Sequence, residues 1–319
     1  MTASNPMSAG GGPPVVGRFA PTPSGRMHLG NVFSCLMAWL SARSTGGRIV
    51  LRIEDLDPRA QDRSVADRLM ADLEWLGLGW DEGPYWQSER ADIYEEAIRR
   101  LSEAGLTYPC FCTRAELHAA TAPHASDGTY LYAGTCRSLT PEQIAERSRR
   151  RAPATRLRVP DADDPAGTIE FCDLACGDFL VRRSDGVFAY QLAVVVDDGL
   201  MGVNQAVRGR DLLGSSARQA YLARLLGLKA PTYGHVPLLT APDGRRLSKR
   251  DQDLDLGALR QRGVSSRRII GALAAAAGIA QKGEEASPEE LLGRFSWEII
   301  AAHRGDIVIN HEFLLGLVG

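Results

Sequence analysis

The chain has 319 residues, of which 44% are hydrophobic and 24% charged, and its formal net charge is −2. This composition is typical of a globular protein with one large domain or two modest ones, and it excludes a disordered chain and a general nucleic-acid coat. The longest apolar run, 269–280, is too short and too rich in Ala and Gly to span a bilayer, and no signal pattern opens the chain. We therefore expect a cytoplasmic protein with no membrane contact.

The first half of the chain alternates strand and helix patterns. Residues 1–14 are small, polar and rich in Gly and Pro, which predicts a disordered tail. Apolar runs predict strands at 15–19 and 48–53, and helical spacing predicts helices at 31–43, 63–76 and around 93–101. Alternation of this kind predicts an α/β fold with a parallel sheet and helices on both of its faces.

The pattern changes after residue 107. Cysteines, polar turns and short strands occupy 108–173, which we interpret as an inserted subdomain. The apolar run 188–198 predicts a buried strand, and helices are expected at 215–226, 259–260, 265–277 and 288–295. We therefore expect a catalytic domain from 15–107 and 174–250, an insertion at 108–173 and a helical C-terminal portion at 251–319.

The run Gly17–Asn31 predicts a strand, a phosphate loop and a helix. Gly25 and Gly30 remove side chains where a phosphate could approach, and the first amides of the helix near Leu29 would supply hydrogen-bond donors. His28 would stand at the mouth of that helix. Taken alone, the pattern also fits a tight turn before a core helix with a structural histidine.

A second segment of interest, 243–250, forms a basic loop after the apolar run 236–239. It contains Ser248 and Lys249 between Arg246 and Arg250. An isolated basic run would usually be a solvated turn. Its occurrence downstream of the His28 loop favours a functional interpretation.

Together, His28–Asn31 and Arg246–Arg250 resemble the HIGH and KMSKS motifs of the class I aminoacyl-tRNA synthetases. Residues 47–57 and 188–198 are similar to the glutamate-specific branch of that class, and the resemblance covers 15–250. Arg246 replaces the usual first Lys and Arg250 the last Ser, which keeps the positive charge of the loop. The resemblance implies a Rossmann-like catalytic domain that uses ATP with Mg²⁺.

The resemblance also implies the residues of the site. Catalytic roles fall to His28 and Lys249, and ATP binding to His28, Gly30, Asn31, Ser248 and Lys249. Residues around L-glutamate would be Arg18, Phe19, Ala20, Pro21, Thr22, Glu54, Tyr190 and Arg208. Guanidinium groups suit two carboxylates and Glu54 suits an ammonium group, although the sequence does not decide which arginine takes which carboxylate. Glu54 would also fit as a surface carboxylate at a strand end.

Cysteines 110, 112 and 136 with Tyr132 form a Cys-x-Cys…Tyr-x-x-x-Cys pattern that predicts one structural Zn²⁺. His118 and His124 lie between the pairs and remain alternative ligands to Tyr132. The remaining thiols have apolar neighbours and are expected in the core: Cys35, Cys172 and Cys176. The basic stretch 147–158 could contact RNA phosphate or form a solvated helix face.

Short length and the cysteine insertion make the chain similar to a paralogue within the glutamate branch that lacks an anticodon-binding domain. That paralogue transfers activated glutamate to the queuosine base of tRNA(Asp), so we expect a monomeric ATP-dependent ligase with this partner. A truncated glutamyl-tRNA synthetase that charges a tRNA 3′ end is the nearest alternative. A non-catalytic paralogue that binds glutamate or RNA, and a small-molecule nucleotidyltransferase, are two others.

Overall fold

The computed structural model describes residues 13–119, 132–159, 177–245 and 255–318 of the chain. These residues form two compact units, each assembled from segments that are distant in the sequence. Unit 1 comprises Met1–Ser88, Val203–Arg210 and Thr232–Gly319, and unit 2 comprises Glu89–Gly202 and Asp211–Pro231. The tail predicted at 1–14 lies outside the described residues up to position 12. Among the described helices, none combines the length and hydropathy that crossing a bilayer requires.

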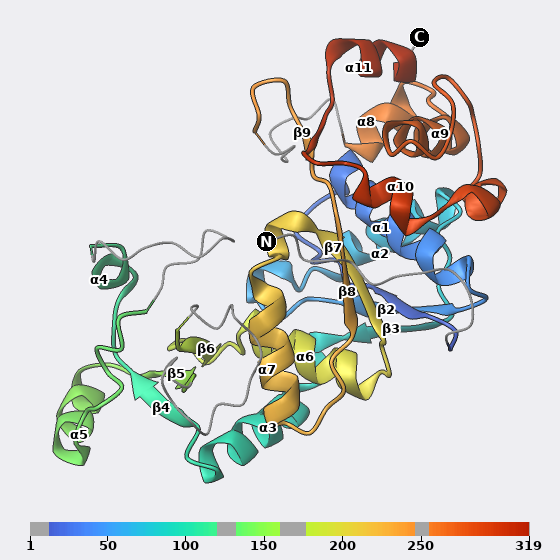
Figure 1. Cartoon of the computed structure of the whole chain (residues 1–319). Coiled ribbons are helices and arrows are strands. Elements are labelled where there is room, and N and C mark those ends of the chain that lie inside the picture. The colour runs from blue at the N-terminus through green and yellow to red at the C-terminus, as the bar shows by residue number, and fades with distance from the viewer. Residues whose placement is uncertain (1–12, 120–131, 160–176, 246–254, 319) are drawn as a thin grey trace. The chain divides into compact units, whose positions relative to one another are not determined.

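Unit 1 contains the parallel strands, the helices that cover them and a helical C-terminal portion (Figure 1). Its strands are β1 (Val16–Phe19), β2 (Arg48–Ile53), β3 (Glu82–Trp86), β7 (Gln205–Gly209), β8 (Thr232–Val236), β9 (Leu239–Thr240) and β10 (Ile307–Val308). Its helices are α1 (Leu29–Arg43), η1 (Pro58–Ala60), α2 (Arg63–Trp75), α8 (Leu256–Gln261), α9 (Ser266–Ala276), η5 (Glu289–Arg294), α10 (Trp297–Ala301) and α11 (His311–Val318). The strands and helices predicted before residue 80 are therefore confirmed to within two residues.

The strands of unit 1 pair in parallel. β1 pairs with β2, β2 with β3, and β7 with β8, so that Arg18 lies opposite Val50 and Arg208 opposite His235. β7 runs beside β1 in the same direction, because the Asn204 backbone N–H donates to the Val16 carbonyl over 3.0 Å and Arg18 Nη1 reaches the Val207 carbonyl over 3.2 Å. The carboxyl ends of these strands therefore meet at one edge, where open α/β sheets bind ligands.

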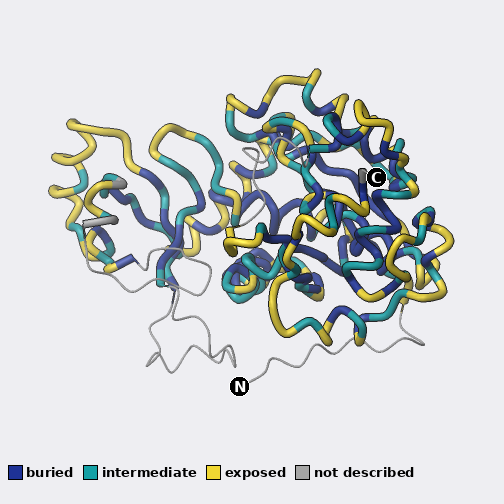
Figure 2. Tube along the Cα trace, turned by 90° about the horizontal axis from the view of Figure 1, so that it is seen from above, coloured by how far each residue is buried: buried dark blue, intermediate teal, exposed yellow. Residues whose placement is uncertain are grey.

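Helix α1 forms the centre of the unit 1 core. Its apolar residues are buried together with those of β2 and α9, including Leu36, Leu40, Ile49 and Ile270, each fully inaccessible to solvent. Figure 2 shows this arrangement as dark blue segments along the inner strands and helices, with exposed yellow residues on the outer turns. Burial of this apolar surface is the main stabilising contribution to the unit.

Trp297 at the start of α10 packs directly against β8. Its indole Nε1 donates to Ser41 Oγ over 3.0 Å, and Ser41 Oγ donates to Gln205 Oε1 over 2.6 Å, so the three side chains form a buried chain from α10 through α1 to β7. Gly234 leaves room for the ring: a Cβ at this position would lie 2.3 Å from Trp297 Cη2. The glycine therefore allows the C-terminal portion to contact the sheet.

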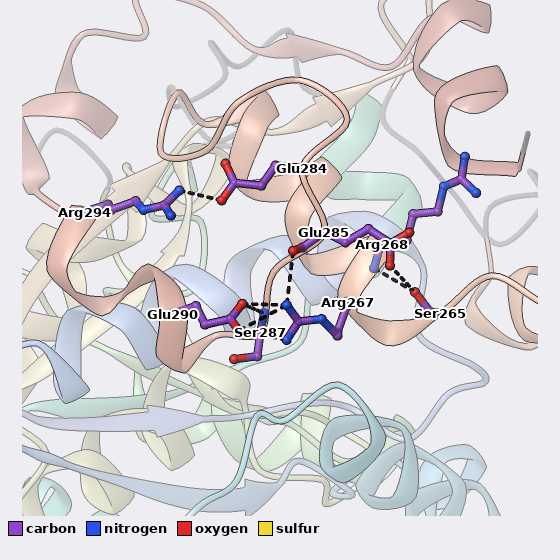
Figure 3. Close-up of polar contacts among 8 residues, drawn as sticks. All are labelled: Ser265, Arg267, Arg268, Glu284, Glu285, Ser287, Glu290 and Arg294. Carbon is purple, nitrogen blue, oxygen red and sulfur yellow. Dashed lines mark hydrogen bonds and ion pairs between the residues drawn. The ribbon is translucent and has the colours of Figure 1, made fainter.

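One ion pair joins the segment after α9 to that helix, and another lies within the segment (Figure 3). Arg267 Nη2 lies 2.8 Å from Glu290 Oε2 and donates to the Glu285 carbonyl, while Arg294 pairs with Glu284 over 2.6 Å. These side chains are largely exposed, and exposed ion pairs contribute little to the free energy of unfolding. The Arg267 contacts join the segment to α9, and the pair of Arg294 with Glu284 joins two parts of the segment to each other.

Unit 2 contains an antiparallel sheet and a group of helices (Figure 1). The sheet has the order β4 (Thr107–Cys110), β5 (Ala154–Leu157) and β6 (Phe179–Arg182). The helices are α3 (Ala91–Glu103), α4 (Arg114–Ala119), α5 (Pro141–Arg150), α6 (Tyr190–Leu200) and α7 (Ser215–Leu225). Two short helices lie where the chain passes between the units: η2 (Gln87–Glu89) and η3 (Arg210–Leu212).

The strand predicted at 188–198 is wrong, because this segment is helix α6. Its run of three valines, Val194–Val196, favours a strand by propensity. However, every residue from Leu192 to Asp198 is buried, including Asp197, which accepts hydrogen bonds from Arg90 Nε over 2.7 Å and from the Tyr94 hydroxyl over 2.8 Å. A helix that is buried on all sides has no polar face, so its sequence lacks the amphipathic period. The helix predicted at 288–295 is a 3₁₀-helix, η5, of six residues.

We expect Gly234→Ala to destabilise unit 1, because the added methyl group would overlap the Trp297 ring. Overpacking of this kind costs about 1–3 kcal/mol, which should lower the Tm in thermal denaturation by roughly 3–10 °C. Gly79→Ala is the matched control, since nothing lies within 4 Å of its Cβ position. An unchanged Tm for Gly234→Ala would contradict the packing described for Trp297.

Candidate functional site

The His28 loop joins β1 to α1 as predicted, and His28 is the N-cap residue of the helix. Its Nδ1 accepts a hydrogen bond from the Gly30 backbone N–H over 3.1 Å, and its own backbone N–H donates to Asn31 Oδ1 over 3.3 Å. Because Nδ1 accepts, the neutral ring carries its hydrogen on Nε2. His28 can therefore offer an N–H donor, while the Gly30 amide that the sequence assigned to phosphate binding is engaged by the imidazole.

The two ends of the Lys249 segment are held by residues of unit 1. His28 and Asp255 form an isolated antiparallel bridge, and the Leu256 backbone N–H donates to the Met27 carbonyl over 3.1 Å. Asp255, which follows the Lys249 segment, is thus joined to the His28 loop, and its side chain caps α8 at the Ala258 amide over 2.9 Å. Ser248 and Lys249 themselves lie outside the described residues, as do Arg246 and Arg250.

On the other side of that segment, strand β9 pairs in parallel with β10. The Leu238 carbonyl accepts from the Ile307 backbone N–H over 2.8 Å, and the Leu238 N–H donates to Asp306 Oδ1 over 3.0 Å. Arg210 Nε lies 3.4 Å from the same Asp306 carboxylate. The chain that enters the Lys249 segment is therefore fixed by the C-terminal portion, which the sequence did not predict.

Most of the residues predicted to bind the substrate glutamate belong to unit 1 and lie at the carboxyl ends of its strands. Arg18 in β1 is 7% exposed, and the turn that follows it is joined to β2 because the Pro21 carbonyl accepts from the Glu54 backbone N–H over 3.0 Å. Phe19 differs from its neighbours: its side chain is 1% exposed and lies in the apolar core. It can contribute to a ligand site only through its backbone. Ala20 is half-buried, and Thr22 is exposed beside the same turn.

Glu54 has a buried partner that sequence reasoning missed. Arg52 Nη2 lies 3.1 Å from Glu54 Oε1, and the Arg52 side chain is fully buried within β2. Burying a guanidinium is costly unless it is paired, so this contact compensates the buried charge of Arg52 and holds the Glu54 carboxylate in position. The signal was present in the sequence as a charge within the otherwise apolar run 49–53.

Arg208 lies in β7 and is 4% exposed. Its Nε donates to His235 Nε2 over 3.4 Å, and its guanidinium carbon lies 4.4 Å from the ring centroid of Tyr233. Sequence reasoning missed Tyr233 and His235, which lie directly before the apolar run 236–239. Tyr190 belongs to unit 2, where it is the first residue of α6 and its side chain is 38% exposed.

The charges gathered in unit 1 suit an amino acid with a second carboxylate. Guanidinium groups at Arg18 and Arg208 donate in a fork that matches carboxylate geometry, and Glu54 can accept from an ammonium group. The His28 loop in the same unit offers donors for phosphate oxygens. These groups position and stabilise charge, which is the main requirement for attack of a carboxylate on a phosphate.

Three cysteines of unit 2 meet as the sequence predicted. The Sγ atoms of Cys110, Cys112 and Cys136 lie within 4.8 Å of one another, with Cys112 and Cys136 at 3.7 Å. The Tyr132 hydroxyl lies 3.6 Å from Cys110 Sγ and 3.7 Å from Cys112 Sγ. Tetrahedral Zn²⁺ with Zn–S bonds of about 2.3 Å separates its sulfur ligands by about 3.8 Å. Four donors at these spacings fit a closed structural site.

Basic groups surround the cysteines. Arg156 Nε lies 3.2 Å from Cys110 Sγ and its guanidinium stacks on the Tyr132 ring at 3.7 Å, while Arg147 Nη1 lies 3.9 Å from Cys136 Sγ. Arg156 is 6% exposed, so it supports the cluster and cannot take part in the RNA contact considered for the basic stretch. The exposed arginines of that stretch lie near the end of α5: Arg147, Arg149, Arg150 and Arg151.

The protonation of the cluster depends on burial and hydrogen bonding. Burial, reinforced by the neighbouring thiols, raises the pKa of Cys112 to about 11. Burial also acts on Cys136, but hydrogen bonds with the Phe111 backbone, Tyr132 and the other thiols outweigh it and leave the Cys136 pKa below its ordinary value. Cys136 is therefore easier to deprotonate than an ordinary thiol, whereas Cys112 is harder to deprotonate. The alternative ligand His124, together with Cys172 and Cys176, lies outside the described residues, as does the side chain of His118.

Comparison with known proteins agrees with this geometry. Residues 14–300 match the family described as tRNA synthetases class I (E and Q), catalytic domain. A protein of Symbiobacterium thermophilum named glutamyl-Q tRNA(Asp) synthetase is 49% identical over 320 residues, covering 95% of this chain and 98% of the relative. One of the same name from Nitratidesulfovibrio vulgaris is 47% identical, covering 88% of this chain and 91% of the relative.

Among solved structures, a glutamate tRNA ligase from Elizabethkingia meningosepticum in complex with its amino acid is similar with a TM-score of 0.75 and 27% identity. The match covers 95% of this chain and 68% of that chain. The predicted α/β fold with parallel strands is confirmed, and so is the resemblance to the glutamate branch of the class I enzymes. The chain belongs to the class I tRNA synthetases (E and Q), a family of ligases, and contains their catalytic domain.

Proposed function

We propose that this chain activates L-glutamate with ATP to form glutamyl-adenylate and then transfers glutamate to the queuosine base of tRNA(Asp). The observation that carries the proposal is the meeting, within unit 1, of Arg18, Glu54 and Arg208 at the carboxyl ends of three neighbouring strands. Relatives named glutamyl-Q tRNA(Asp) synthetase support the choice of acceptor.

In the first step, a glutamate carboxylate oxygen attacks the α-phosphorus of ATP, and pyrophosphate leaves with the electron pair of the broken P–O bond; Mg²⁺, when bound, would neutralise phosphate charge. We assign the phosphate contacts to His28, Gly30, Asn31 and Ser248, with Lys249 supplying a point charge to the developing negative charge. Arg18 and Arg208 hold the two carboxylates of the substrate. Glu54 accepts from its ammonium group, and Tyr190, together with the backbone of Phe19–Thr22, adds neutral hydrogen bonds.

In the second step, a hydroxyl of the queuosine cyclopentene diol attacks the activated carbonyl carbon and an ester forms. AMP leaves with the electron pair of the broken bond, and the hydroxyl proton passes to a phosphate oxygen of the leaving AMP. The modified base lies in a single-stranded loop, where a nucleotide can be turned out into a pocket. Its diol resembles the terminal ribose diol that other enzymes of the class acylate. The same activated intermediate would therefore serve the transfer.

Labelled glutamate should attach to queuosine-containing tRNA(Asp) and should still attach after the 3′ terminal adenosine has been removed. Unmodified tRNA(Asp) is the matched control, and it should accept no label. Charging of tRNA(Glu) at an intact 3′ end, without transfer to queuosine, would refute the proposed acceptor and establish a truncated glutamyl-tRNA synthetase instead.

We expect Lys249→Ala to lower the rate of adenylate formation by roughly two to three orders of magnitude, the cost of removing one electrostatic donor to a transition state. Affinity for ATP should fall much less, because the charge acts mainly on the developing phosphorane. Single-turnover kinetics with labelled ATP measures both quantities. Lys229→Ala, at an exposed lysine of unit 2, should behave as the unchanged chain. A near-normal rate for Lys249→Ala would overturn its assignment.

We further propose that Cys110, Cys112, Tyr132 and Cys136 hold one structural Zn²⁺, which when bound would link β4 to the turn before α5. The donor set supports this, since thiolates favour Zn²⁺ and four ligands leave no open position for catalysis. Arg156 and Arg147 would stabilise the ligating sulfurs through N–H···S contacts.

Elemental analysis should give about one zinc per chain, and Cys110→Ser or Cys136→Ser should lose it. Cys35→Ser is the control that should retain zinc, because burial raises the pKa of Cys35 to about 12 and keeps it an inert thiol in α1. Cysteine thiols must lose their protons to bind metal, so zinc should be released as the pH falls and the sulfur ligands take up protons. Full zinc content in Cys110→Ser would show that the ligands lie elsewhere.

A further inference from the structure

Arg208 is held from two directions by neighbouring residues of β8. The parallel register of β7 and β8 places His235 directly opposite Arg208, and the pleat places Tyr233 on the same face two residues earlier. Arg208 Nε donates to His235 Nε2 over 3.4 Å, and the guanidinium carbon lies 4.4 Å from the Tyr233 ring centroid. The Tyr233 and His235 rings are themselves stacked, with centroids 6.4 Å apart and an interplanar angle of 27°.

This contact defines the chemical state of the imidazole. A guanidinium has only donors and stays charged, so the nitrogen of His235 that faces it must present a lone pair. We therefore expect a neutral His235 with its hydrogen on Nδ1, because that form presents a lone pair at Nε2. The Nε2 acceptor of His235 fixes the rotation of the Arg208 guanidinium about the Cδ–Nε bond. The face of the Tyr233 ring fixes the plane of the same guanidinium.

Orientation matters because a guanidinium binds a carboxylate best through two parallel hydrogen bonds in one plane. A buried arginine that could rotate would lose part of this advantage as conformational entropy on binding. An acceptor at Nε also directs the remaining edges of the group away from β8. A neutral acceptor does this without cancelling the positive charge that a carboxylate needs.

We infer that His235 is a positioning residue for substrate carboxylate binding, acting through Arg208 with Tyr233 as its support. This inference rests on the proposed glutamate activation, because it assumes that Arg208 receives a carboxylate. It adds a residue beyond the two signature motifs and beyond the groups that contact the amino acid.

The kinetic test compares His235→Leu with His235→Gln in glutamate-dependent exchange of pyrophosphate into ATP. Leucine removes the acceptor, and we expect the KM for glutamate to rise roughly tenfold to a hundredfold, the cost of losing a hydrogen bond to a charged group. Glutamine places a carbonyl oxygen near the Nε2 position and should restore the KM to within about threefold. The KM for ATP should stay unchanged in both variants.

His311→Leu is the matched control, because His311 is an exposed residue at the start of α11 and should leave all constants unchanged. An equal glutamate KM for His235→Leu and the unchanged chain would overturn the inference. So would a parallel rise in the KM for ATP, or a failure of glutamine to restore binding. If the unchanged chain shows no glutamate-dependent exchange at all, the proposed function fails instead.

A second measurement needs neither substrate nor activity. Nitrogen-15 NMR of histidine-labelled protein, with the His235 signals identified by their loss in His235→Gln, reports which ring nitrogen carries the hydrogen. We expect a neutral ring with hydrogen on Nδ1 at pH 7. Hydrogen on Nε2, or a doubly protonated ring, would overturn the inference whether or not His235→Leu folds.

Discussion

The parallel register of four strands determines which charged side chains can meet in unit 1. Pairing of β1 with β2 and of β7 with β8 brings Arg18, Arg52 and Arg208 to the carboxyl ends of neighbouring strands. A slip of one residue in β7 would turn Arg208 away from His235, toward the side where Trp297 packs against Gly234. The contact between Trp297 and β8 and the chain from Trp297 to Gln205 oppose such a slip. Packing of Trp297 on one face of the β7–β8 pair therefore helps to fix the position of Arg208 on the other face.

Each of these guanidinium groups is buried beside an acceptor that orients it. Arg18 donates to the Val207 carbonyl, Arg208 to the His235 imidazole, and Arg52 pairs with the Glu54 carboxylate. Carbonyl and imidazole acceptors orient a cation without neutralising it, whereas the Glu54 contact joins opposite charges. The same edge therefore provides oriented positive groups for carboxylates and a fixed negative group for an ammonium, which is the charge pattern of a dicarboxylic amino acid.

Sequence reasoning predicted the elements of unit 1 well because their apolar periods are clear, and the cysteine cluster because its spacing is specific. It failed at 188–198, where a helix buried on all sides carries no amphipathic pattern and its valines favour a strand. It also missed Arg52, Tyr233, His235 and Asp255. Arg52 has its partner Glu54 only two residues away. The partner of Tyr233 and His235 lies on the adjacent strand and that of Asp255 is distant in the chain, so the sequence does not reveal these contacts.

The same limit applies to the His28 loop. The sequence indicated open helix amides, yet the His28 ring itself caps the Gly30 amide, and the loop is joined to Asp255 at the far end of the Lys249 segment. Local sequence patterns predict which residues belong to such a site. They do not predict how those residues bond to one another before a ligand arrives, since a side chain and a phosphate compete for the same donors.

We propose that the charges at this edge select glutamate for reaction with ATP. The most direct test of this proposal is the exchange of labelled pyrophosphate into ATP with each of L-glutamate, L-glutamine, L-aspartate and D-glutamate, with and without tRNA. We expect exchange with L-glutamate alone among these four amino acids, because only L-glutamate offers two carboxylates and an ammonium group at the required spacing and in the required configuration. Exchange that is equally fast with L-glutamine, or that proceeds without any amino acid, would contradict it.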